Sequence, residues 1–260
     1  MKLHGGDELS RLIYCRHFEM KEREFLNSFL RDGDIFIDVG SNLGLFTLIA
    51  ARKIGPTGRV IAFEPSPVTF TRLKENVQLN GLTNVQCVNA ALSDQSGVSD
   101  FTQSEDGFAA WNSFAAPTKG ERLSTVPVKA ITWDEFAKQQ GLVGRVAMMK
   151  IDVEGWESRV IQGARLCLSR DDAPLLQVEF TDEAARAAGT SCGALYAALE
   201  DFGYRMYSYV PATQAIVSEP PRKEYPYVNL LAVKNLDSII SRLQRPSVEP
   251  RNERELKSPS

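Results

Sequence analysis

The segment between residues 146 and 161, VAMMKIDVEGWESRVI, places charged side chains at the end of an apolar run. Lys150, Asp152 and Glu154 are two residues apart, so on a β-strand they would project to one face. A buried charge without a partner is costly, which indicates that these groups serve one another or a ligand. Crowded carboxylates that are partly shielded from water have raised pKa values and can take a proton from a hydroxyl. The same oxygens could instead hold a hard divalent ion.

An α/β fold must position these groups, because apolar strand-like runs alternate with helical patterns along most of the chain. An antiparallel pair is predicted near the C-terminus, at 203–210 and 227–234, on either side of a proline-rich turn. The expected parallel strands lie within 34–40, 58–65, 85–92, 146–153 and 174–180, and the helices between them within 44–54, 66–81 and 156–169.

The chain is expected to consist of three segments, the second of which contains an insertion. Residues 1–33 form an N-terminal helical cap, and residues 34–236 form the main domain. Within it, residues 98–136 are an insertion in which two short strands flank a long loop. Residues 237–260 contain few large apolar groups, so a disordered tail is expected there.

Each predicted parallel strand delivers a polar residue at its carboxyl end, which is where ligands bind in open parallel sheets. One such end would mean little, but five in the same position predict a binding site. The residues are Asp38 for the first strand, Glu64 for the second, Asn89 for the third, Asp152 with Glu154 for the fourth, and Glu179 for the fifth.

The turn after the first predicted strand favours one kind of nucleotide ligand. A dinucleotide fold needs three glycines and a pyrophosphate at the helix start, whereas here Gly40 and Gly44 flank Asn42, and Phe46 stands near the third glycine position. Asp38 also disfavours a pyrophosphate. A ligand with an amino-acid group and a ribose suits this turn better, and Glu64 can accept both ribose hydroxyl protons. S-adenosylmethionine is such a ligand.

Composition narrows the partners and the location. The chain has 260 residues and a net charge of −3, without a dense run of Lys or Arg, so a nucleic-acid partner is not expected. Neither a signal core nor an apolar run of membrane-spanning length is evident, and we expect a cytoplasmic protein. The four cysteines are scattered without a zinc-like spacing.

Three stretches, DIFIDVGSNLGLFTLIAARKIGPTGRVIAFEPSP, NVQCVNAALSDQSG and MMKIDVEGWESRVIQGA followed by LLQVEF, resemble the FkbM family of S-adenosylmethionine-dependent class I methyltransferases. The resemblance implies a Rossmann-like, seven-stranded, mostly parallel sheet with an antiparallel C-terminal strand. It also implies methyl transfer to a hydroxyl of a sugar, glycan or natural product. The cofactor residues carried over by motif position are Asp38, Gly40, Ser41, Asn42, Gly44 and Thr47 at the methionine end, Glu64, Pro65 and Ser66 at the ribose, Asn89 and Ala90 at the adenine, and Asp152.

Such a reaction needs a base. Nothing in the sequence requires this base to be a histidine, because His4 and His17 both precede the first strand. The predicted catalytic residues are Lys150, Asp152, Glu154 and Glu179. Two mechanisms remain open, with a direct general base favoured over a bound divalent metal.

Other interpretations of single residues also stay open. Lys150 and Asp152 could be a structural ion pair, and Glu157 is expected to be a solvated helix residue. Phe108, Trp111 and Phe114 could stack on a sugar or cover the core.

Two rival functions are weighed against methyl transfer. A nicotinamide-dependent oxidoreductase lacks support because no third glycine or Tyr-x-x-x-Lys pair is present. A non-catalytic S-adenosylmethionine-binding protein is opposed only by the carboxylates after the fourth strand. The acceptor and the oligomeric state are not predicted.

Overall fold

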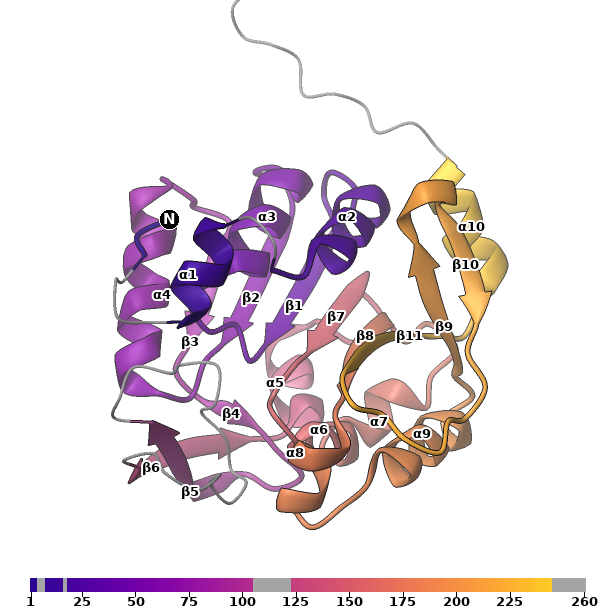
Figure 1. Cartoon of the computed structure of the whole chain (residues 1–260). Coiled ribbons are helices and arrows are strands. Elements are labelled where there is room, and N and C mark those ends of the chain that lie inside the picture. The colour runs from indigo at the N-terminus through magenta and orange to yellow at the C-terminus, as the bar shows by residue number, and fades with distance from the viewer. Residues whose placement is uncertain (4–7, 16–17, 105–122, 245–260) are drawn as a thin grey trace, which may run out of the picture.

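A computed structural model describes residues 1–3, 8–15, 18–104 and 123–244 (Figure 1). Its centre is one eight-stranded sheet, in which the five strands from β3 to β8 run parallel and β11 is antiparallel to both of its neighbours. The spatial order is β10 (Ala215–Ser218), β9 (Arg205–Val210), β11 (Val228–Val233), β8 (Leu175–Phe180), β7 (Met148–Ile151), β1 (Ile35–Val39), β2 (Arg59–Phe63) and β3 (Val85–Val88).

Helices cover both faces of this sheet, and the side chains alternate between the two resulting layers. Phe36 and Met148 pack into one layer, and their neighbours Ile37 and Met149 pack into the other. The first layer contains α2 (Met20–Phe29), α3 (Leu45–Ile54), α4 (Pro67–Leu79) and α10 (Leu236–Gln244), and the second contains α5 (Trp133–Gln140), α6 (Glu157–Gln162), α7 (Arg165–Leu168) and α9 (Cys192–Asp201).

Shorter elements complete the chain. The helix α1 (Glu8–Tyr14) precedes α2, the helix α8 (Asp182–Ala187) follows β8, and a short turn of 3-10 helix, η2 (Pro211–Thr213), follows β9. A separate three-stranded sheet has the order β4 (Ala91–Leu92), β6 (Leu123–Ile131), β5 (Gly97–Ser104). Its β5 and β6 are the two strands expected to flank the long loop, and residues 105–122 between them lie outside the described residues.

The α/β class, the mostly parallel sheet and the antiparallel strand near the C-terminus are confirmed, but the expected count of seven strands is wrong. The additional strand is β10, at the edge beside β9. It forms because η2 and the left-handed Gln214, with φ of 51°, fold the chain back along β9. A left-handed glutamine gives no turn signal in the sequence, which explains the difference.

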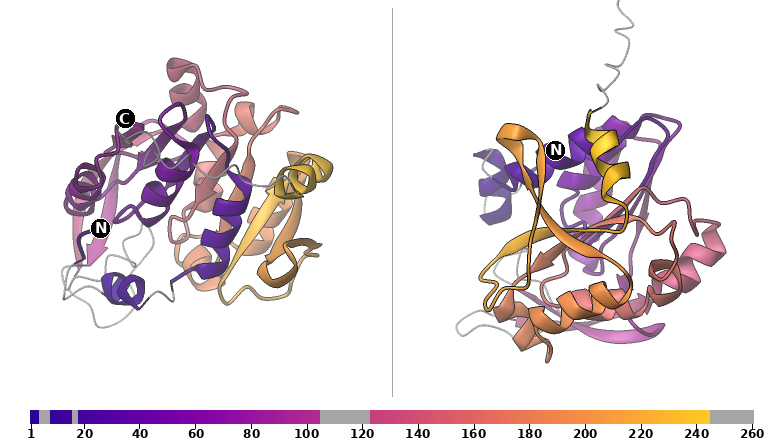
Figure 2. Two further views of the ribbon diagram at one scale, coloured as in Figure 1. Left: turned by 90° about the horizontal axis from the view of Figure 1, so that it is seen from above. Right: turned by 90° about the vertical axis from the view of Figure 1, so that its right-hand side faces the viewer.

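The tail expected at 237–260 is also wrong over its first residues, because 237–244 belong to α10. Ile239 and Leu243 are one helical turn apart and pack into the same core layer as α2. Arg242 forms an ion pair with Asp34, and its guanidinium lies 4.7 Å from the centroid of the Phe29 ring. Figure 2 shows α10 beside α2. Residues 245–260 lie outside the described residues.

The N-terminal segment is helical as expected, but α2 is part of the core. Phe25, Leu26 and Phe29 are at most 2% exposed and pack against the sheet. Among the described residues, no helix is both long enough and apolar enough to cross a membrane.

Candidate active site

The carboxyl ends of β1, β7 and β8 meet at one edge of the sheet and present a row of buried polar side chains. Asp38 of β1 lies opposite Lys150 of β7, which lies opposite Gln177 of β8. All three are at most 3% exposed. Because parallel strands are in register here, the residues that follow them also lie at this edge.

The turn after β1 brings two backbones unusually close. Gly40 has a φ of 79°, and a side-chain carbon at this position would lie 1.8 Å from the carbonyl oxygen of Asp152. The N–H groups of Gly40 and Ser41 donate to the carbonyl of Phe63 at 3.1 and 2.9 Å, which fixes the turn to the end of β2. Gly44, with φ of 89°, then begins α3. Only glycine combines these positive φ values with so close an approach.

Asp38 lies below this turn and points into the first helical layer. Thr47 of α3 donates its hydroxyl to a carboxylate oxygen of Asp38 at 2.5 Å. Burial raises the pKa of Asp38, although Lys150 and the bond from Thr47 oppose the rise. An ammonium or hydroxyl donor from a ligand would therefore stabilise the charged form of this group.

Glu64 joins two loops at the end of β2. One of its carboxylate oxygens accepts the N–H of Asn42 at 3.0 Å, and the other accepts the N–H of Ser66 at 2.9 Å. Burial raises the pKa of Glu64 to about 7 in spite of these bonds. Asn89 reaches the same place from β3, because its side chain donates to the carbonyls of Glu64 and Pro65 at 2.8 and 3.0 Å. The three strand ends thus form one connected structure.

Lys150 is a buried cation among acidic groups. Its ammonium bonds to a carboxylate oxygen of Asp152, lies 3.8 Å from the Oε2 atom of Glu19, and sits 4.5 Å from the ring centroid of Phe46. Burial alone would lower the pKa of Lys150, but Asp152, Glu19 and Asp38 outweigh it and raise the pKa. Lys150 therefore stays protonated.

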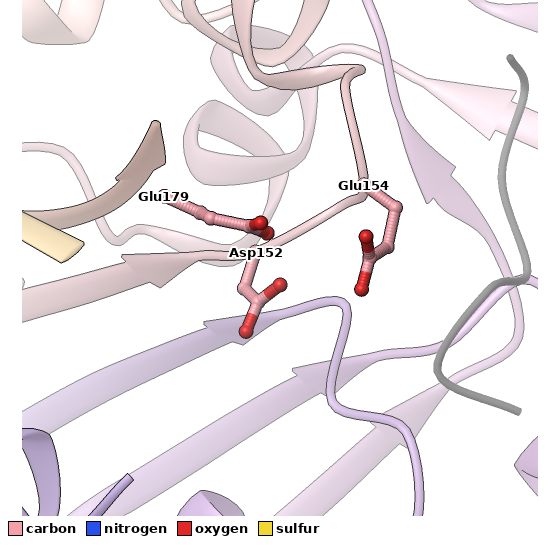
Figure 3. A group of neighbouring side chains, drawn as sticks. All are labelled: Asp152, Glu154 and Glu179. Carbon is pink, nitrogen blue, oxygen red and sulfur yellow. The ribbon is translucent and has the colours of Figure 1, made fainter. Parts of the chain in front are cut away.

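Asp152 and Glu154, which follow β7, form an acidic cluster with Glu179 near the end of β8, and each has a ligand atom within 4.8 Å of the other two (Figure 3). For Glu154 and Glu179, burial and then the charge of Asp152 raise the pKa well above its usual value, as expected for crowded carboxyls. Asp152 differs from that expectation. Burial would raise its pKa, but Lys150 and hydrogen bonds outweigh burial and lower it.

Glu157 bonds to the turn that carries Glu154 and is buried. The expectation that Glu157 is solvated is therefore wrong. Glu157 is 4% exposed, and one of its carboxylate oxygens accepts the N–H groups of Val153 at 3.0 Å and Gly155 at 3.3 Å. Burial raises the pKa of Glu157 to about 7. An acid in the first turn of a helix can be solvated or can bond to the preceding loop. Both cases give the same sequence pattern, so the sequence could not distinguish between them.

Four polar residues at this edge were missed by the sequence reasoning. Gln177 and Asn229 lie inside apolar strands, where a lone polar residue is the only signal that could have found them. Glu19 and Tyr227 carry no local signal. Their contact arises because α2 begins beside β11, where Tyr227 donates its hydroxyl to Glu19 at 2.8 Å.

The structure brings together all the predicted catalytic and cofactor residues that follow β1, β2, β3, β7 and β8. Ala90, expected at the adenine, is buried directly after the exposed Asn89. His4, His17 and the aromatic residues Phe108, Trp111 and Phe114 lie outside the described residues.

Known proteins resemble the part of the chain that contains most of these residues. The family description Methyltransferase FkbM domain matches residues 38–206. The hexuronic acid methyltransferase AglP of Haloferax volcanii is 35% identical over 132 residues, which cover 51% of this chain and 50% of AglP. The 31-O-demethyl-FK506 methyltransferase FkbM of Streptomyces tacrolimicus is 29% identical over 163 residues, which cover 52% of this chain and 60% of that protein.

The chain thus spans about half the length of the first of these curated relatives and 60% of the second. Among solved structures, methyltransferase FkbM from Methylobacillus flagellatus matches with a TM-score of 0.46 at 12% identity. That match covers 78% of this chain and 44% of the other.

Proposed function

The chain belongs to the FkbM family of methyltransferases, and we propose that it transfers a methyl group from S-adenosylmethionine to a hydroxyl oxygen of a sugar, glycan or related natural product. The observation that carries this proposal is the acidic cluster of Asp152, Glu154 and Glu179 beside the Gly40 turn. The names of two relatives, a hexuronic acid methyltransferase and a 31-O-demethyl-FK506 methyltransferase, are consistent with acceptors of this class.

The cofactor is proposed to lie across the ends of β1, β2 and β3. The buried carboxyl of Asp38 is placed for the amino group of the methionine end, where a positive charge would offset the cost of its burial. The carboxylate of Glu64 would accept hydrogen bonds from the two ribose hydroxyls. It lies between the loops after β1 and β2, because it accepts the N–H groups of Asn42 and Ser66. The complete proposed set is Asp38, Gly40, Ser41, Asn42, Gly44, Thr47, Glu64, Pro65, Ser66, Asn89, Ala90 and Asp152.

In the proposed reaction an acceptor oxygen attacks the methyl carbon in line with the sulfonium. The carbon–oxygen bond forms while the carbon–sulfur bond breaks, and S-adenosylhomocysteine leaves neutral. The enzyme mainly supplies alignment, and the hydroxyl proton must leave as the new bond forms. Glu154 and Glu179 are the proposed proton acceptors, because their raised pKa values make their ionised forms the stronger bases. Asp152, kept ionised by Lys150, orients the hydroxyl.

A bound divalent cation is the second candidate mechanism, and a specific observation favours it. The Oε2 atom of Glu179 is buried and accepts no hydrogen bond from the described part of the chain. It lies in a cluster of three carboxylates, which are the ligands that Mg²⁺ and Ca²⁺ prefer. A metal there would acidify the acceptor hydroxyl directly.

Calorimetric titration with S-adenosylhomocysteine tests the proposal, with NAD as the control ligand and with EDTA or magnesium added in parallel. Binding of S-adenosylhomocysteine alone is the expected result, and binding of NAD instead would overturn it. Transfer of labelled methyl groups to a panel of hydroxylated sugars then tests activity. Loss of transfer in EDTA, restored by magnesium, would select the metal mechanism.

Asp152→Asn tests the catalytic role of the acidic cluster. We expect methyl transfer to fall at least about a hundredfold, because a misplacement of about 1 Å at a reacting centre has an effect of that size. Asp201→Asn is the matched control, because Asp201 is exposed at the end of α9 and remote from the cluster in sequence. Undiminished transfer by Asp152→Asn would show that the cluster is not catalytic.

A further inference from the structure

Glu19 stands at the start of α2 in a conformation that needs an explanation. Its φ of 44° and ψ of 48° place it in the left-handed region, which non-glycine residues rarely adopt. Short polar side chains in this position usually accept an N–H group of their own helix, but the side chain of Glu19 makes no such bond. It turns into the protein instead and is only 5% exposed.

The carboxylate of Glu19 meets β11 on one side and β7 on the other. Its Oε1 atom accepts the hydroxyl of Tyr227 at 2.8 Å and the amide of Asn229 at 3.3 Å. Its Oε2 atom lies 3.8 Å from the ammonium of Lys150, which is too long for a hydrogen bond. Within the described residues, Oε2 has no hydrogen-bond partner.

Anchoring α2 does not explain these contacts. Phe25, Leu26 and Phe29 already bury that helix against the sheet. The ionisable groups that face Glu19 are Lys150 and Asp152 from β7 and its end, Tyr227 beside β11, and Glu22 from α2. Burial raises the pKa of Glu19 to about 7, although the charge of Lys150 and the hydrogen bond from Tyr227 oppose the rise.

Lys150 therefore has two carboxylates competing for one ammonium, Asp152 in direct contact and Glu19 at 3.8 Å. The ammonium has three donors and can serve both, and the Phe46 ring below it limits where it can go. Because the ammonium bonds directly to Asp152, the first residue of the acidic cluster, a shift of Lys150 would move that carboxylate as well.

We propose that Glu19 is a positioning residue of the active site, which holds the Lys150 ammonium between two carboxylates and so fixes the orientation of Asp152. This inference rests on the proposed function in one respect, the catalytic role of the cluster. It makes the segment before β1 a part of the active site, and it assigns Tyr227 and Asn229 the task of holding Glu19. In the reaction, Glu19 acts through Lys150 and does not touch the substrate.

The Lys150 side chain offers a signal that needs no acceptor. Because its ammonium lies over the Phe46 ring, the ring current shifts the adjacent methylene protons, and NMR of protein labelled with ¹³C at lysine Cε detects them. Lys150→Arg identifies the resonance by its loss. In Glu19→Gln we expect this resonance to move, because Gln keeps the size and the Tyr227 bond but removes the charge that attracts the ammonium.

Glu22→Gln is the matched control, since it removes the same charge one turn along α2 and should leave the Lys150 resonance in place. Glu19→Asp keeps the charge and should return the resonance part of the way. An unchanged resonance in Glu19→Gln, or an equal change in Glu22→Gln, would overturn the proposal.

Two further measurements keep this test separate from the proposed function. In Glu19→Gln, the kcat of methyl transfer should fall by a larger factor than the affinity for S-adenosylhomocysteine, because Asp152 is only one of the twelve proposed cofactor residues. A wild-type protein that fails to bind S-adenosylhomocysteine would refute the proposed function and leave the NMR result intact. A kcat equal to wild type in Glu19→Gln would refute the positioning role alone.

Discussion

Gly40→Ala isolates the close approach on which the proposed cofactor site depends. The added carbon would lie 1.8 Å from the carbonyl oxygen of Asp152 and 3.2 Å from a methyl group of Val153. Real side-chain carbons essentially never come within 3.0 Å of such an atom, so the turn after β1 and the end of β7 must separate by more than an ångström. The Asp152 carbonyl belongs to the backbone and cannot rotate away.

The size of the effect follows from two contributions. A left-handed alanine costs about 1–2 kcal/mol, and forcing an extra carbon into a packed contact costs about 1–3 kcal/mol. We therefore expect Gly40→Ala to lower the free energy of unfolding by about 2–5 kcal/mol. A displacement of about 1 Å at a reacting centre reduces catalysis by about a hundredfold, and S-adenosylhomocysteine binding should weaken as well.

Gly81→Ala is the control, because it introduces a left-handed alanine without forcing a carbon into a packed contact. Gly81 also has a positive φ, of 63°, but a side-chain carbon there would have no neighbour within 4 Å. Urea denaturation should show a loss of about 1–2 kcal/mol for this variant, and calorimetry should show wild-type affinity. Equal losses of stability in the two variants, together with wild-type affinity in Gly40→Ala, would refute the reasoning.

Two more predictions concern the parts of the fold that the sequence misassigned. Glu157→Gln should flatten the fall in stability between pH 5 and 8, by at most about 3 kcal/mol. Because the folded-state pKa of Glu157 is raised from 4.5 to about 7, its contribution is complete below pH 4.5 and is lost as pH rises through 7. Urea denaturation at both ends of that range measures it, and an unchanged slope would contradict it. Ile239→Ala should cost about 2–4 kcal/mol because its side chain is 7% exposed in the core. Ile240→Ala, at 36% exposure on the same helix, should cost much less, and similar losses would show that α10 does not dock as described.

The sequence predicted the strands and the glycine turn because both depend on local chemistry. Apolar runs of strand length and glycines at a strand end restrict the backbone whatever lies elsewhere in the chain. The residues that follow those strands could also be placed at one edge, since parallel strands have aligned ends. Asp38, Glu64 and Asp152 were found in this way.

Contacts between distant segments could not be predicted, because no local pattern encodes them. Glu19 and Tyr227 are far apart in the chain and meet only because α2 begins beside β11. The direction of the pKa shift at Asp152 was missed for a related reason. Crowding by carboxylates was visible in the sequence, but the direct bond from Lys150 that outweighs it depends on side-chain geometry.

The spacing of the KIDVEGWE segment follows from the separate roles of its residues between the end of β7 and the start of α6. Lys150, the last lysine inside β7, faces the helical layer and holds Asp152 in its ionised form. Glu154 has a positive φ of 52°, so the chain reverses there and directs its carboxyl back toward the strand ends.

Gly155 and Glu157 hold that reversal in place. At Gly155, with φ of 99°, a side-chain carbon would lie 2.4 Å from the carbonyl oxygen of Ala184, so only glycine lets α8 pack against the turn. Glu157 then accepts the N–H groups of Val153 and Gly155 and closes the turn from below. Each position has a separate physical requirement, and together they place Glu154 beside Asp152 and Glu179. A shift of any one residue along the chain would break a contact that the others depend on.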